Sequence, residues 1–68
     1  MLHHTVTYVI AGEREEIRTG FWRPKTITPA GCSRIVAKLH NANARIGAPK
    51  VRPSDVLILR VQCARRAQ

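Results

Sequence analysis

The sequence predicts a small α+β domain in which one helix packs on one face of a three-stranded sheet. Three observations predict it: two segments of alternating residues near the N-terminus, one well-marked helix after them, and a third apolar segment near the C-terminus. The order strand, strand, helix, strand gives a two-layer ββαβ arrangement. With 68 residues, the chain is expected to form a single domain over 1–68.

The first two strands form a predicted β-hairpin. Alternation in β-branched and aromatic residue types predicts a strand over 5–11 and another over 17–22, and Gly12 opens the charged turn between them. Gly20 inside the second strand predicts a bulge or a close backbone contact. Pro24 ends that strand because proline cannot donate to a ladder.

The helix is predicted from Pro29 to about Ile46. Thr28 is a favoured N-cap, Pro29 suits the first turn, and Gly47 supplies a left-handed stop. Apolar residues at helical spacing predict one buried stripe, formed by Cys32, Ile35, Val36, Leu39, Ala42 and Ile46. The opposite stripe is polar, basic and expected to be exposed, and it holds Arg34, Lys38, Asn41 and Arg45.

A final strand is predicted from Val56 to Cys63, after a basic loop bracketed by two prolines. Because it follows a helical crossover, it should run parallel to the second strand and antiparallel to the first, in the spatial order 2-1-3. Period-two alternation places one set of its residues on one face: Leu57, Leu59, Val61 and Cys63. The chain ends are expected to be loose, with a frayed N-terminus over 1–4 and a basic tail over 64–68.

One helix covers only one face of such a sheet, so the other face should stay open. Val9, Val56, Ile58 and Trp22 are expected to be apolar residues on that face. Exposed apolar clusters often mark an interface, so Trp22, Val56 and Ile58 are candidate interface residues. Scattered surface residues without a function are the alternative interpretation.

Positive charge is the least ordinary feature of the composition. The chain has 12 Lys and Arg against 4 Asp and Glu, for a net charge of +8. From Cys32 onward eight basic residues and one acidic residue, Asp55, carry +7 of it. Such asymmetry is typical of a surface for phosphates or for an acidic protein. A codon bias that favours arginine is another possible origin.

Residue patterns that carry catalytic chemistry are scarce. Cys32 and Cys63 lack the close spacing of zinc or redox motifs and are expected to be reduced, mostly buried thiols. The three histidines lack the spacing of a structural metal site, and the acidic cluster Glu13 to Glu16 lies in a turn, where carboxylates are usually solvated. We therefore expect a protein that is not an enzyme, with no metal site and no cofactor.

Two classes of function remain. The first is a basic binding module that contacts DNA or RNA phosphates through Arg34, Lys38, Arg45, Lys50 and Arg52. The alternative is a protein-interaction or structural module, which would use the open sheet face or an edge strand to bind an acidic protein or to form a homodimer. No apolar run is long enough for a membrane span and no signal peptide is apparent, so a cytoplasmic location is expected.

Overall fold

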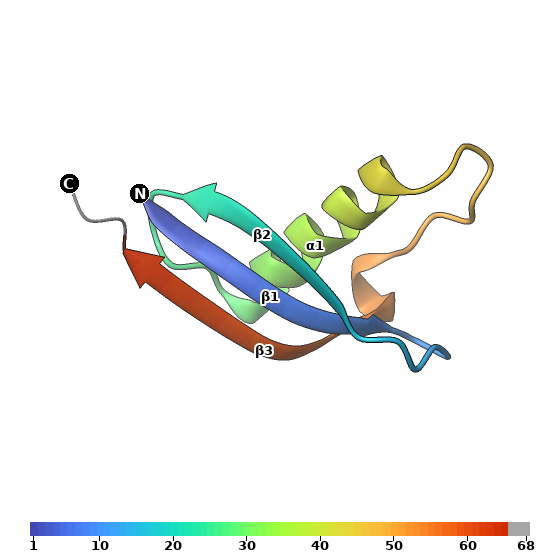
Figure 1. The fold of residues 1–68 in the computed structure, drawn as a ribbon, viewed down its shortest axis with the longest axis horizontal. Coiled ribbons are helices and arrows are strands. Elements are labelled where there is room, and N and C mark those ends of the chain that lie inside the picture. The colour runs from blue at the N-terminus through green and yellow to red at the C-terminus, as the bar shows by residue number, and fades with distance from the viewer. Residues whose placement is uncertain (66–68) are drawn as a thin grey trace.

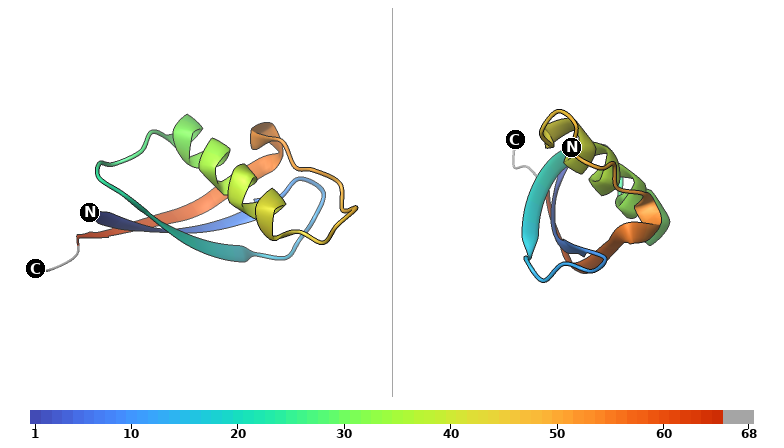
Figure 2. Two further views of the ribbon diagram at one scale, coloured as in Figure 1. Left: turned by 90° about the horizontal axis from the view of Figure 1, so that it is seen from above. Right: turned by 90° about the vertical axis from the view of Figure 1, so that its right-hand side faces the viewer.

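The structure is a computed structural model that describes residues 1–65. Its elements, in chain order, are β1 (Leu2–Ile10), β2 (Ile17–Arg23), α1 (Pro29–Asn43), the short 3₁₀ helix η1 (Pro53–Asp55) and β3 (Val56–Arg65). The strands form one sheet in the order β2-β1-β3, with β1 antiparallel to both neighbours. Helix α1 lies across one face of the sheet (Figure 1, Figure 2), which confirms the predicted two-layer α+β fold and the strand order.

The central strand β1 has one fully buried face. Its alternation turns four side chains toward the helix: His4, Val6, Tyr8 and Ile10. Val6 and the helical residue Val36 are both completely buried. Phe21, Cys32, Ala37 and Val56 complete the buried cluster between the layers. The hydrophobic driving force for folding is therefore concentrated between β1 and α1.

Strand β1 begins at Leu2, so the prediction of a frayed segment over 1–4 is wrong. His4 is only 3% exposed, and its ring stacks on Phe21 with the two centroids 5.3 Å apart. Histidine has no strong strand preference, and it is pairing with both neighbouring strands that orders this end of β1. The prediction of a loose tail over 64–68 is wrong for Ala64 and Arg65, because β3 continues to Arg65; residues 66–68 lie outside the described residues.

The two glycines of the hairpin have different roles. Gly12 has a φ of 84°, and the neighbouring Glu13 N–H donates to the Ile10 carbonyl at 2.9 Å, which closes a tight turn. At Gly20 an added Cβ would lie 2.9 Å from His3 Nε2. The predicted close contact at Gly20 is thus made by a side chain, and the pairing of β1 with β2 has no bulge there.

Helix α1 starts as predicted and ends earlier than predicted. Thr28 Oγ1 accepts a hydrogen bond from the Gly31 N–H at 3.1 Å, which confirms the N-cap. The helix ends at Asn43, whose side-chain amide donates to the Leu39 carbonyl at 2.9 Å and so competes with continued helix pairing. The predicted stripe is therefore wrong at its C-terminal end, where two of its residues are exposed: Ala42 and Ile46. Gly47 does adopt a positive φ, of 89°, but in a separate turn.

The first residues of β3 face the opposite way from the prediction, whereas Val61 and Cys63 pair with the helix-facing residues Val6 and His4 of β1. Val56 is buried and Ile58 packs against the core, so neither is the open-face interface residue that the sequence suggested. Leu57 on the open face is 58% exposed. The register moves from Tyr8↔Ile58 to Thr7↔Arg60, which leaves Leu59 as an extra residue in a bulge. Alternation could not assign these faces because every residue from Val56 to Leu59 is apolar.

Replacement of Thr28 by alanine tests the start of the helix. The substitution removes the acceptor for the Gly31 N–H and should lower the free energy of unfolding by about 1 kcal/mol. Urea denaturation followed by circular dichroism measures the change. Thr26→Ala, in the exposed segment before the cap, is the matched control and should change stability much less. Equal effects of the two substitutions would contradict the cap.

Candidate nucleic-acid interface

Asn41 holds the basic loop against the helix. Its Nδ2 donates to the Val51 carbonyl at 2.9 Å, and its Oδ1 accepts from the Val51 N–H at 2.8 Å. Both bonds are partly buried, and together they satisfy the two backbone groups of Val51 in the way a neighbouring strand would. The residues on either side of Val51, Lys50 and Arg52, are therefore held beside the helix.

The predicted basic residues are placed differently relative to this clamp. Lys38 lies one helical turn before Asn41 on the same side of α1, and Arg34 lies one turn earlier still. Lys38, Lys50 and Arg52 are thus brought to one region of the surface, and Arg34 extends it along the helix. Arg45 follows the helix C-cap in a loop that projects from the end of α1 (Figure 1), so it does not continue the helical stripe as predicted.

The side chains of this surface are free to meet an anionic ligand. All five predicted residues are exposed: Arg34, Lys38, Arg45, Lys50 and Arg52. Within residues 1–65 none of them forms an ion pair with a carboxylate. The nearby Asp55 carboxylate instead accepts from the Arg52 backbone N–H at 3.1 Å. The positive charge of this surface is therefore uncompensated.

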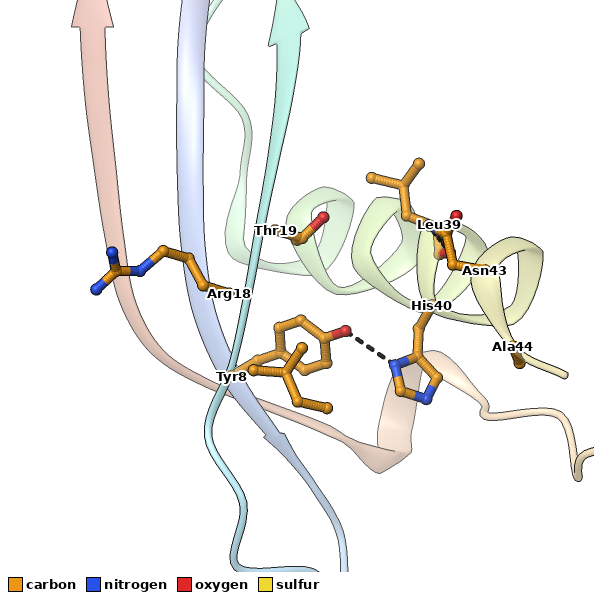
Figure 3. A pocket seen from close by; sticks show the side chains of 8 residues that line it. Tyr8, Arg18, Thr19, Leu39, His40, Asn43 and Ala44 are labelled. Carbon is orange, nitrogen blue, oxygen red and sulfur yellow. Dashed lines mark hydrogen bonds between the residues drawn. The ribbon is translucent and has the colours of Figure 1, made fainter.

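A cavity of about 320 Å³ lies between β2 and the end of α1 (Figure 3). At its wall a hydrogen bond of 2.9 Å joins the Tyr8 hydroxyl to His40 Nδ1. Burial raises the pKa of Tyr8 above its ordinary value, so the phenol is neutral at physiological pH. No local sequence pattern pairs Tyr8 with His40, because the two residues lie 32 positions apart. The hydrogen bond ties the central strand to the last turn of the helix.

The two thiols have unlike surroundings. Cys32 is buried, and burial raises the pKa of its thiol, so it is a poor nucleophile. Cys63 is exposed, which corrects the prediction that both thiols are mostly buried. Its Sγ lies 3.7 Å from His4 Nε2, directly across the β1–β3 pair. Among the described residues no three His, Cys, Asp or Glu side chains gather in a way that could hold a metal ion.

Comparison with known proteins adds no relative: the sequence matches no protein-family model and no curated protein, and no solved structure matches it. In the part of the chain described here, no helix has the length and apolar character needed to cross a membrane. The function must therefore be inferred from the geometry and charge of this chain.

Replacement of Asn41 by alanine should release the basic loop. Two partly buried hydrogen bonds are lost and the Val51 backbone groups lose their partners, so the free energy of unfolding should fall by about 2 kcal/mol. Hydrogen exchange at the Val51 amide, measured by NMR, should become faster by more than the global loss of stability explains. Asn43→Ala is the matched control because Asn43 bonds only to its own helix. An unchanged Val51 exchange rate in N41A would show that the clamp does not hold the loop.

Proposed function

We propose that this protein is a small binding module that contacts nucleic-acid phosphates through the basic helix and loop surface. The observation that carries the proposal is the Asn41 clamp, which holds Lys50 and Arg52 beside Lys38. Positive side chains that are held in place without carboxylate partners suit the binding of a polyanion. A surface that contacts only water would not need such an arrangement.

The chemistry of this surface favours affinity over sequence recognition. Lysine and arginine contact phosphate oxygens and release condensed counterions, and such contacts carry no base information. The function we propose is thus non-catalytic binding to DNA or RNA, with the shape of the ligand as the main source of selectivity. A cytoplasmic location is part of the same proposal, since the ligand is nucleic acid.

Salt dependence tests the proposed surface. Four or five phosphate contacts should make the logarithm of the affinity for duplex DNA fall with the logarithm of salt at a slope of about −4. Replacement of Lys38 and Arg45 by glutamine should reduce that slope by about two units without changing the circular dichroism spectrum. Fluorescence anisotropy of a labelled duplex measures both slopes.

A charge-matched control uses Arg14 and Lys25, which lie in the hairpin turn and in the loop before the helix. Their replacement by glutamine removes the same net charge from other parts of the surface and should leave the slope nearly unchanged. If both double variants lower the slope equally, net charge alone explains binding and the helix and loop surface is not the site.

The edge strand β3 favours a second function, strand pairing with an acidic protein or with another copy of this chain. It is ten residues long, and the exposed apolar side chains along it are Leu57, Leu59 and Val61. The other edge, β2, is shorter, with seven residues. Beside β3 lies an apolar cavity of about 420 Å³ with Val61 at its wall, which a pairing strand could cover.

A lysine at Val61 tests pairing through this edge. Val61 is 47% exposed, so the long side chain can reach water without unfolding the core, and its charge should block an incoming strand. Sedimentation velocity should show a dimer of the unmodified protein that becomes a monomer in Val61→Lys. Gln62→Lys adds the same charge to the open face and should leave the dimer intact. A monomeric unmodified protein at high concentration would exclude self-pairing.

A further inference from the structure

The open face of the sheet, turned away from α1, differs in composition from the face that packs against the helix. Cross-strand partners point to the same face, so the register of the sheet defines rows of neighbouring side chains. In order along the sheet, the open-face rows are Trp22, His3 and Ala64; Gly20, Thr5 and Gln62; Arg18, Thr7 and Arg60; and Val9 with Leu57. This face is thus polar and basic in its middle rows and aromatic at one end.

The aromatic end is a pair of rings on neighbouring strands. The His3 and Trp22 centroids are 4.7 Å apart at an interplanar angle of 52°, and Trp22 is 43% exposed. Gly20 makes this arrangement possible, because a Cβ there would lie 2.9 Å from His3 Nε2. Arg23 Nη1 donates to the Trp22 carbonyl at 2.7 Å, and its guanidinium lies over the Phe21 ring on the other face. The backbone that carries Trp22 is therefore held in place.

The basic row crosses the middle of the same face. Arg18 and Arg60 both pair with Thr7, one from each side, and both are exposed. Figure 3 shows the Arg18 side chain extending away from α1, while Thr19 points toward the helix. Trp22 lies four residues after Arg18, so at the rise of a strand the two are about 13 Å apart. None of the strands β1, β2 and β3 contains Asp or Glu, so the face presents positive charge without a carboxylate.

We propose that the open face binds single-stranded nucleic acid, with a base stacked on the Trp22 and His3 rings and phosphates against Arg18 and Arg60. Single strands present both a phosphate chain and accessible base faces, whereas a duplex hides the base faces within its stack. The carboxylates of an acidic peptide would match the charge of the arginines but would offer no base to stack on the aromatic pair. This surface lies on the other side of the sheet from the helix and loop surface, and it goes beyond the function proposed above.

Trp22 is the chain's single tryptophan, so its fluorescence reports directly on this face. The probes are oligothymidylate, oligouridylate and an abasic deoxyribose phosphate chain, each of about 12 nucleotides. Both base-containing strands should quench Trp22 emission. The abasic chain carries the same charge, yet it should bind at least about tenfold more weakly and leave the emission unchanged. The tighter binding of oligothymidylate or of oligouridylate identifies whether DNA or RNA is the preferred source of the strand.

Four variants separate stacking from charge. Trp22→Ala should weaken the binding of labelled oligothymidylate about tenfold, whereas Trp22→Phe keeps a ring and should lose less. The double change of Arg18 and Arg60 to glutamine should reduce the salt slope of single-strand binding by about 1.4. Trp22 is unchanged in this variant, so its fluorescence still reports binding. The double change of Lys38 and Arg45 to glutamine, on the helix side, should leave the quenching unchanged.

Equal binding and quenching by the abasic chain would overturn the proposal, as would unchanged Trp22 emission with either base-containing strand at low salt. Loss of quenching in the Lys38 and Arg45 variant, but not in the Arg18 and Arg60 variant, would overturn it as well. The duplex salt slope tests the helix and loop surface separately. Either surface can therefore fail without the other.

Discussion

Burial of one face of β1 against α1 is the constraint on which the rest of the structure depends. β1 lies between β2 and β3, and its inner side chains Val6 and Tyr8 are covered by the helix that carries Val36. The hydrogen bond between Tyr8 and His40 ties the same strand to the last turn of that helix. The two edge strands are ordered through β1, and the basic loop is ordered through α1 and Asn41.

A single helix on a three-stranded sheet leaves much of the molecule available for contact. The helix side carries the basic surface around the Asn41 clamp, and the opposite side carries the open face with its arginine row and aromatic pair. Both surfaces are positive, yet they offer different chemistry. The first offers point charges on a convex helix, which suits phosphates of any structured nucleic acid, and the second adds ring surfaces that suit unstacked bases.

Part of the candidate site could be predicted from composition and spacing. Arg34 and Lys38 follow from helical periodicity, and Lys50 and Arg52 follow from their position in a proline-bracketed loop. The clamp that gathers them could not be predicted, because an asparagine on a polar helix face usually bonds to water, and nothing local identifies Val51 as its partner. The open-face rows could not be predicted either, since they depend on the register of three strands and on which residues of β3 face the helix.

The sequence by itself determined the three strands, the helix, their order and the N-cap at Thr28, because these follow from local backbone preferences and from residue alternation. The early end of α1 has a local cause as well, since Asn43 bonds to Leu39 of its own helix and the chain leaves α1 three residues before the predicted end. Tertiary structure decided which residues of β3 are buried and where Cys63 lies. From Val56 to Leu59 every residue of β3 is apolar, and only pairing with β1, with its bulge at Leu59, selects the residues that pack against the helix. These choices depend on partners distant in sequence, and no local pattern contains them.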